Sequence, residues 1–266
     1  MDYQQFLEIS WRDYIENTPS AKNILNLLQS EGETVENDHI AFRTWSHNDK
    51  VSLEQFKRPF LDWGLREMGQ YFFKNKKVQA IHLEHPTNKN IPKVFISEIL
   101  WKEFSPEFQK IMNRTLESIP VNQSIIDLLK KKVCWDQKVE EFEVLAKESE
   151  YGAWLYAWGI RPNHFTVNIN SLKKFPTIES LNQWLKNHGF SLNSSGGEVK
   201  GSAQIFLEQS SIMADMVNFT FSNGTKNIPS CYYEFAKRYI DHSGSLYQGF
   251  HEASADKIFE STNARR

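Results

Sequence analysis

The chain of 266 residues contains only two cysteines, carries a formal net charge of −2 and has no long apolar run. Cys134 and Cys231 lie far apart and show no metal-type spacing, so we expect reduced thiols. Lysine and arginine are scattered, whereas nucleic-acid binding needs a basic stripe. No segment approaches the roughly 18–20 apolar residues of a membrane span, and the N-terminus lacks the features of a signal peptide. The sequence therefore predicts a cytoplasmic protein without nucleic-acid or membrane partners.

The composition is typical of a folded protein, with 40% hydrophobic and 14% aromatic residues. The length allows a large buried core. Apolar residues recur at helical spacing in the N-terminal segment and in the middle of the chain, while alternating segments occupy much of the rest. We predict one catalytic domain in four parts: N-terminal helices in residues 1–37, a first module in 38–101, a helical insert in 102–158, and a second module with the C-terminal tail in 159–266.

The segment His164–Asn170 alternates strictly between polar and apolar residues, as a β-strand with two different faces does. His164, Thr166 and Asn168 share the polar face of this strand. An earlier predicted strand, His39–Trp45, also begins with a histidine. Two strands that each open on a histidine suggest a metal site made by two related halves.

Four pairs of segments correspond along the chain, which indicates a duplication. The pairs are His39 with His164 and Ser52–Gly64 with Thr177–Gly189, both 125 positions apart, Ile81–Glu84 with Ile205–Glu208 at 124, and Val94–Glu98 with Ser230–Glu234 at 136. We predict an α+β fold of two paired β-α-β-β-β modules that form a half-open β-barrel, with an N-terminal helical segment and a central helical insert.

In this fold the two first strands would supply His39 and His164 to a shared cavity, and a last strand would supply Glu234. Two histidines and one carboxylate with open coordination positions suit a non-haem Fe(II) oxygenase. Glu98 as a fourth ligand would instead favour a metal such as Zn or Ni, and Glu208 is a competing ligand. We expect three ligands, with Glu98 behind them or paired elsewhere.

Arg43 shares a strand face with His39, and beside an open metal its guanidinium fork suits a substrate carboxylate. Thr166 and Asn168 would belong to the cavity wall. Simpler roles stay open, because a strand histidine is often a satisfied structural residue and Arg43 can neutralise Asp38. Glu234 likewise has two nearby cations with which it can pair, Lys237 and Arg238.

Four short motifs stand out: Asp38-His-Ile-Ala-Phe-Arg43-Thr, Asn163-His-Phe-Thr-Val-Asn, Tyr233-Glu-Phe and Ala253-Ser-Ala-Asp-Lys-Ile-Phe259. They resemble the 2-oxoadipate dioxygenase/decarboxylase family of the vicinal-oxygen-chelate superfamily, and the resemblance runs from about residue 35 to the C-terminus. It implies that His39, His164 and Glu234 hold Fe(II) and that Arg43 binds a 2-oxo acid. It also implies that a backbone position in the C-terminal segment lines the substrate pocket, and the best match for it is Ala253, next to Ser254.

The chain departs from this family in two ways: its central insertion is shorter, and Ala253 stands where the family has a larger residue. The resemblance implies conversion of a 2-oxo dicarboxylic acid such as 2-oxoadipate, with O2, to a 2-hydroxy acid such as 2-hydroxyglutarate and CO2. Two alternatives stay open: a glyoxalase-type lyase or isomerase that needs no oxygen, and a metal-free small-molecule binding module. A hydrolase has no support, because a Gly-x-Ser-x-Gly elbow is missing.

Overall fold

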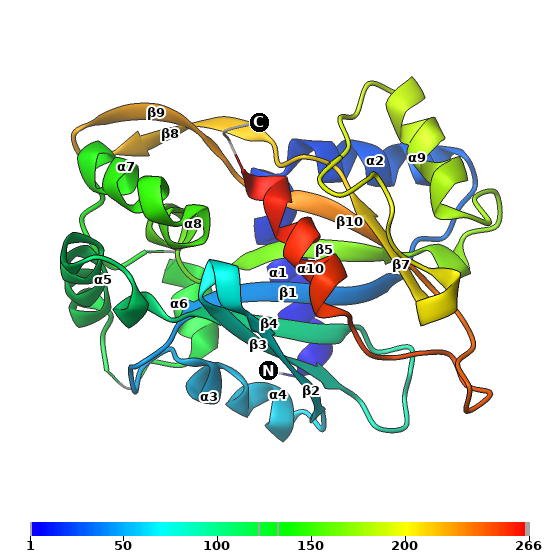
Figure 1. Cartoon of the computed structure of the whole chain (residues 1–266), viewed down its shortest axis with the longest axis horizontal. Coiled ribbons are helices and arrows are strands. Elements are labelled where there is room, and N and C mark those ends of the chain that lie inside the picture. Colours follow the sequence, from blue (N-terminus) through cyan, green and yellow to red (C-terminus); the bar gives the residue numbers. More distant parts are fainter. Residues whose placement is uncertain (1, 122, 132, 264–266) are drawn as a thin grey trace.

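The computed structural model describes residues 2–121, 123–131 and 133–263, and eight of its strands form one curled sheet. These strands are β1 (Asn37–Trp45), β2 (Arg66–Phe73), β3 (Val78–Glu84), β4 (Lys93–Ile99), β5 (Pro162–Asn168), β6 (Lys200–Ser202), β7 (Leu207–Ser211) and β10 (Tyr232–Arg238). They lie in the order β2-β3-β4-β1-β5-β10-β7-β6 (Figure 1). The two central strands, β1 and β5, are antiparallel, and each has a parallel outer neighbour, β4 or β10.

The sheet is therefore two β-α-β-β-β modules joined through their first strands, which confirms the predicted fold class. The helix of the first module is broken into α3 (Leu53–Phe56) and α4 (Arg58–Asp62), and that of the second is α9 (Ile178–Asn187). A separate hairpin of β8 (Met216–Phe221) and β9 (Gly224–Pro229) is inserted between β7 and β10. This hairpin accounts for the larger sequence offset between the last strands of the two modules.

The predicted match of Glu98 with Glu234 is wrong. Counted from the strand pairs that contain the two histidines, Glu234 of β10 corresponds to Phe95 of β4. A sequence offset counts inserted residues, whereas backbone hydrogen bonds set the register. An error of three residues in a strand also exchanges its two faces, because side chains alternate. Glu98 therefore points to the opposite side of the sheet from Phe95.

Helices cover the sheet on both sides. α1 (Tyr3–Asn17) and α2 (Pro19–Ser30) lie behind it in Figure 1, and α10 (Glu252–Ile258) crosses in front of β1 and β5. Between the modules the chain forms α5 (Pro106–Ser118), α6 (Ile125–Lys131), α7 (Val139–Glu148) and α8 (Glu150–Trp158). Short 3-10 turns occupy Lys74–Lys76, Trp101–Glu103, Ile169–Ser171, Ala203–Ile205 and Phe259–Thr262.

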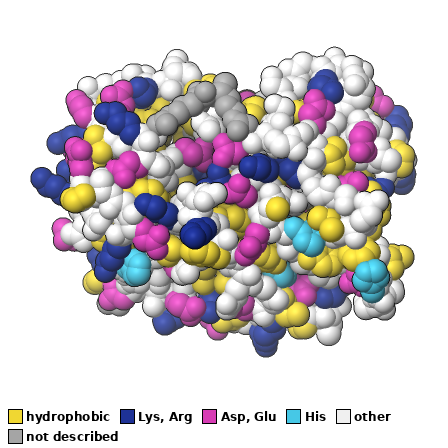
Figure 2. Space-filling model, in the orientation of Figure 1, with side chains coloured by type: hydrophobic (Ala, Val, Ile, Leu, Met, Phe, Trp, Pro, Cys, Tyr) yellow, Lys and Arg dark blue, Asp and Glu magenta, His cyan; other side chains and the backbone are white. Residues whose placement is uncertain are grey.

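This double cover buries β1 and β5 on both faces. The polar faces of these strands, which would meet water in an open sheet, are instead enclosed beneath α10 and the turn that follows it. Buried polar groups need partners or a ligand. Within the described part of the chain, no helix is both long and apolar enough to cross a membrane. On the face shown in Figure 2, basic side chains are interspersed with acidic ones.

Candidate metal centre

Two β-bulges aim the central histidines. In the pairing of β1 with β5, Asp38 is the extra residue on one strand and Asn163 is the extra residue on the other. These two positions are 125 residues apart, which is the same sequence offset as that between His39 and His164, the residues that directly follow them. A bulge bends a strand and re-aims its side chains. Each bulge residue thereby contacts the ring of the histidine that follows it.

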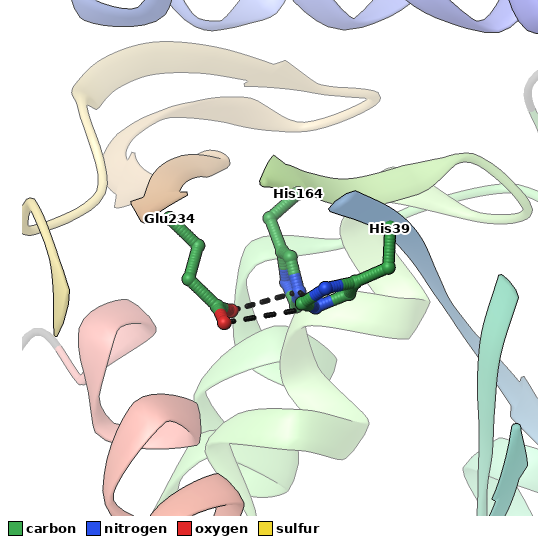
Figure 3. A group of neighbouring side chains, drawn as sticks. All are labelled: His39, His164 and Glu234. Carbon is green, nitrogen blue, oxygen red and sulfur yellow. Dashed lines mark hydrogen bonds and ion pairs between the residues drawn. The ribbon is translucent and has the colours of Figure 1, made fainter. Parts of the chain in front are cut away.

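The side chains of His39, His164 and Glu234 converge on one point (Figure 3). His164 Nε2 lies 3.0 Å from Glu234 Oε2 and 3.4 Å from His39 Nε2, and His39 Nε2 lies 3.6 Å from Glu234 Oε1. Metal–ligand bonds of about 2.0–2.2 Å place neighbouring donors of an octahedral ion about 3 Å apart. The three atoms therefore have the spacing of three adjacent coordination positions.

The protonation of the cluster suits a cation. Burial lowers the pKa of His164, which keeps its imidazole neutral, as a metal ligand must be. Burial alone would raise the pKa of Glu234, but the two imidazoles and a hydrogen bond from Gln209 outweigh it and hold that pKa below its usual value. The Gln209 Nε2 group donates to Glu234 Oε1 at 2.6 Å. His164 is therefore a neutral donor, and Glu234 is an ionised carboxylate.

Asp38 fixes the orientation of His39. The Nδ1 atom of His39 lies 2.7 Å from Asp38 Oδ1, which leaves Nε2 for a metal. Arg238 donates to both oxygens of the same carboxylate, at 2.6 and 2.9 Å. Burial would raise the pKa of Asp38, but Arg238, Lys93 and the histidine hydrogen bond hold it well below its usual range. In the second module Asn163 Oδ1 lies 3.3 Å from His164 Nδ1.

Replacing Asp38 by asparagine should lower the free energy of unfolding by about 3–5 kcal/mol, because it leaves buried Arg238 without its anion. Metal affinity should also fall about 10- to 100-fold. The folded-state pKa of Asp38 is depressed, so its stabilisation is present above the unfolded pKa and is lost as the pH falls below about 4. Urea unfolding at several pH values tests this. Asn163→Ala is the matched change in the second module, and an equal loss of stability there would contradict the assigned role.

Four other residues were predicted to lie near the ligands, as cavity wall, as a competing ligand or as support behind them, and the structure separates them. Thr166 Oγ1 lies 3.1 Å from His39 Nε2 and so contacts a candidate ligand directly. Asn168 instead begins the turn Ile169–Ser171 by accepting a hydrogen bond from the backbone N–H of Asn170. Glu208 accepts from the hydroxyl of Tyr239 at 2.6 Å. Neither of the last two contacts the cluster.

Glu98 serves the fold on the other face of the sheet. Its Oε2 accepts from the backbone N–H of Leu53, in the first turn of α3, at 2.8 Å. Its Oε1 accepts from the side-chain amide of Gln79. A carboxylate at a helix N-terminus satisfies an otherwise free donor. Of the two expected alternatives for Glu98, these contacts correspond to the one in which it pairs elsewhere.

A small cavity lies against the three donor atoms. The Phe250 ring, 4.8 Å from the ring of His39, forms one wall, and Phe95 forms another. The C-terminal segment contributes Ala255, Ile258 and Phe259. Apolar walls limit the access of water to the donor atoms and strengthen electrostatic interactions inside the cavity.

The two residues predicted to bind substrate in this segment lie elsewhere. Ala253 is exposed, and Ser254 is buried against Gly201 of β6. Residues three and four apart share a helix face, so the face that meets the cavity contains Ala255, Ile258 and Phe259. The C-terminal segment thus borders the cavity through other side chains, and the predicted role of Ala253 and Ser254, which concerns a backbone position, stays a prediction.

Arg43 is 1% exposed, yet few of its five N–H donors have partners. Nη2 donates to Thr262 Oγ1 at 2.9 Å, and Glu150 Oε1 lies 4.0 Å away. The guanidinium carbon is 4.7 Å from the ring centre of Tyr151 and 5.0 Å from that of Trp154. Nε and Nη1 have no hydrogen-bond partner among the described residues. Such buried free donors fit a carboxylate ligand.

Sequence reasoning missed the roles of Asp38 and Gln209. A bulge cannot be recognised from the alternation of polar and apolar residues. Nothing in the sequence therefore indicated that the side chain of Asp38 lies on the same side of the sheet as that of His39. Gln209 directly follows Glu208, the residue that the sequence offered as a competing ligand. Alternation places these two on opposite faces, and only the register with β10 shows which face meets Glu234.

Two paired β-α-β-β-β modules around a cavity with two histidines and a carboxylate define the vicinal-oxygen-chelate class of proteins. Within that class, the chain belongs to the 2-oxoadipate dioxygenase/decarboxylase family, whose model matches residues 2–132 and 121–246. The family prediction is thus confirmed.

Three relatives illustrate the likeness. The chloroplastic 2-oxoadipate dioxygenase/decarboxylase of Arabidopsis thaliana is 34% identical over 94% of this chain and 74% of its own length. The hydroxyglutarate synthase of Oryza sativa, solved in complex with 2-oxoadipate, is 31% identical with a TM-score of 0.88, over 98% of this chain and 92% of that one. A protein of Shewanella frigidimarina NCIMB 400, provisionally named a hydrolase, is 46% identical with a TM-score of 0.87, over 95% and 98%.

Proposed function

We propose that the protein is an Fe(II)-dependent dioxygenase/decarboxylase that converts a 2-oxo dicarboxylic acid, of the 2-oxoadipate kind, and O2 to a 2-hydroxy acid and CO2. The observation that carries this proposal is a set of three donor atoms at the spacing of adjacent coordination positions, together with an arginine whose Nε and Nη1 have no hydrogen-bond partner among the described residues. The relatives named for this activity, one of them solved with 2-oxoadipate bound, support the same substrate class.

The donor set fits iron. Two imidazoles and one carboxylate are the ligand set of non-haem Fe(II) oxygenases, in which the remaining coordination positions serve the substrate and dioxygen. Fe(II) held by His39, His164 and Glu234 would supply the activation of dioxygen that drives decarboxylation and hydroxylation. Asp38 and Gln209 fix the donor atoms of His39 and Glu234, so little reorganisation accompanies metal binding.

Arg43 is placed for the far end of a dicarboxylic acid. It stands four residues beyond His39 on the same strand, roughly 13 Å along β1 at the level of the backbone. One end of the acid would meet the metal ligands while the guanidinium holds the other carboxylate. The apolar walls formed by Phe250 and Phe259 suit the methylene chain between the two ends and exclude water.

The geometry favours this activity over a glyoxalase-type reaction with four protein ligands. Among the described residues, the cluster that could hold a metal contains His39, His164 and Glu234 without a fourth member. The predicted fourth ligand, Glu98, faces α3. A metal-free binding module would not require three convergent donor atoms, nor the hydrogen bonds by which Asp38 and Gln209 orient two of them.

Oxygen-electrode measurements on the Fe(II)-loaded protein with 2-oxoadipate test the proposal. We expect one O2 consumed and one CO2 released for each 2-hydroxyglutarate formed, which balances all atoms of the substrate. Equal conversion of 2-oxoadipate under nitrogen would refute the dioxygenase and favour the oxygen-independent alternative. Elemental analysis of protein purified without oxygen separates iron from Zn or Ni.

A further inference from the structure

The hydroxyl group of Tyr232 is a buried donor in the cavity wall that no step described above employs. The Tyr232 side chain is fully buried, and its ring stacks on the imidazole of His164 with 4.7 Å between ring centres and 30° between planes. The residue lines the metal cavity. Its hydroxyl oxygen has no hydrogen-bond partner among the described residues. An unsatisfied buried hydroxyl is unfavourable unless a ligand provides the missing partner.

The sheet register places Tyr232 between the metal ligands and Arg43. Glu234 of β10 pairs with Thr166 of β5, which in turn pairs with His39 of β1, so these three residues form one row across the sheet. The next row on this face contains Tyr232, His164, Ala41 and Phe95, and the row after that contains Arg43. Successive rows are about 6.6 Å apart, because each is two residues further along the strands.

A ligand that extends from the metal ligands to Arg43 must therefore cross the row of Tyr232. Ala41 is the small residue of that row, and the larger side chain of Tyr232 lines the cavity. A tyrosine hydroxyl is both a donor and an acceptor of hydrogen bonds, so it is able to donate one to an oxygen of a ligand.

We propose that the hydroxyl of Tyr232 donates a hydrogen bond to an oxygen of the bound 2-oxo acid and so positions the substrate between the metal ligands and Arg43. This inference rests on the proposed function, since it assumes that a 2-oxo acid occupies the cavity. It assigns the residue to substrate binding, and its ring remains part of the wall beside His164.

The chain contains a matched control in the adjacent residue. Tyr233 is also fully buried, and its hydroxyl oxygen likewise lacks a partner in the described part of the protein. Because side chains alternate along β10, Tyr233 points to the other face, where it contacts the rings of Trp11 and Tyr14. Removing either hydroxyl deletes one unsatisfied buried group, but only that of Tyr232 faces the substrate cavity.

The test compares wild type, Tyr232→Phe and Tyr233→Phe, each loaded with Fe(II) in the absence of O2. Calorimetry measures the dissociation constant of 2-oxoadipate, and thermal unfolding measures the stability of each ligand-free protein. We expect Tyr232→Phe to bind 2-oxoadipate about 10- to 100-fold more weakly, as for a lost hydrogen bond to a charged group, with an unchanged or higher melting temperature. Tyr233→Phe should bind as wild type does.

Each other outcome is decisive. Unchanged affinity in Tyr232→Phe overturns the inference and leaves the proposed function intact. A fall in both affinity and melting temperature for Tyr232→Phe overturns it as well, because the hydroxyl would then have a structural partner within the protein. If wild type binds no 2-oxoadipate although it binds Fe(II), the proposed function fails, and the inference fails with it.

Discussion

Replacing His164 by alanine should abolish both iron binding and oxygen consumption. His164 Nε2 is the donor atom closest to Glu234, at 3.0 Å, and it also lies 3.4 Å from His39 Nε2. Without it the ion would keep two protein ligands. Loss of a residue that only hydrogen-bonds to a metal ligand weakens metal binding about 10- to 100-fold, so loss of a ligand itself should weaken it by more. Elemental analysis and the oxygen-electrode assay measure the two effects.

His82→Gln is the control for this variant. His82 is buried as deeply, at 3% exposed, and contacts the ring of Phe250, yet it does not belong to the three convergent donors. It should retain iron and activity. A His164→Ala protein that still binds Fe(II) as tightly as wild type would show that the metal is held elsewhere, and with it the proposed activity would lose its basis.

Much of the architecture could be predicted because a duplication and the alternation of polar and apolar residues are both visible in the sequence itself. The strict alternation of His164–Asn170 identified a strand, and the offset of 125 identified its partner. The register of the last strands could not be predicted in the same way. The hairpin β8–β9 adds residues to one module only, so matching Glu98 to Glu234 placed a carboxylate on the wrong face.

The candidate site could likewise be predicted only in part. His39, His164, Glu234 and Arg43 could be singled out because strand position and residue type together indicate their chemistry. The contacts that orient them depend on bulges and on pairing between distant strands, as Asp38 and Gln209 show. The C-terminal segment could be placed over the cavity from its sequence. The face that it turns toward the cavity depends on how α10 is rotated about its axis, and only the structure shows that Ala255 lies on that face.

Arg43→Met should separate substrate binding from metal binding. Methionine keeps an apolar contact with the rings of Tyr151 and Trp154, but it removes the donors that face a carboxylate. Loss of one partner of a buried charge pair corresponds to at least about 2 kcal/mol, or roughly 30-fold in affinity. We expect the dissociation constant of 2-oxoadipate to rise by at least that factor while the iron content stays unchanged.

A second ligand shows which carboxylate Arg43 holds. 2-Oxohexanoate has the same chain length as 2-oxoadipate but lacks the far carboxylate. If Arg43 binds that group, the dissociation constant of 2-oxohexanoate should differ little between wild type and Arg43→Met, and wild type should bind it as weakly as the variant binds 2-oxoadipate. Arg161→Met, at another buried arginine beside an aromatic ring, should leave the affinity for both acids unchanged. Equal losses for both acids in Arg43→Met would instead place the guanidinium at the 2-oxo end, because both ligands share that end and differ only at the other.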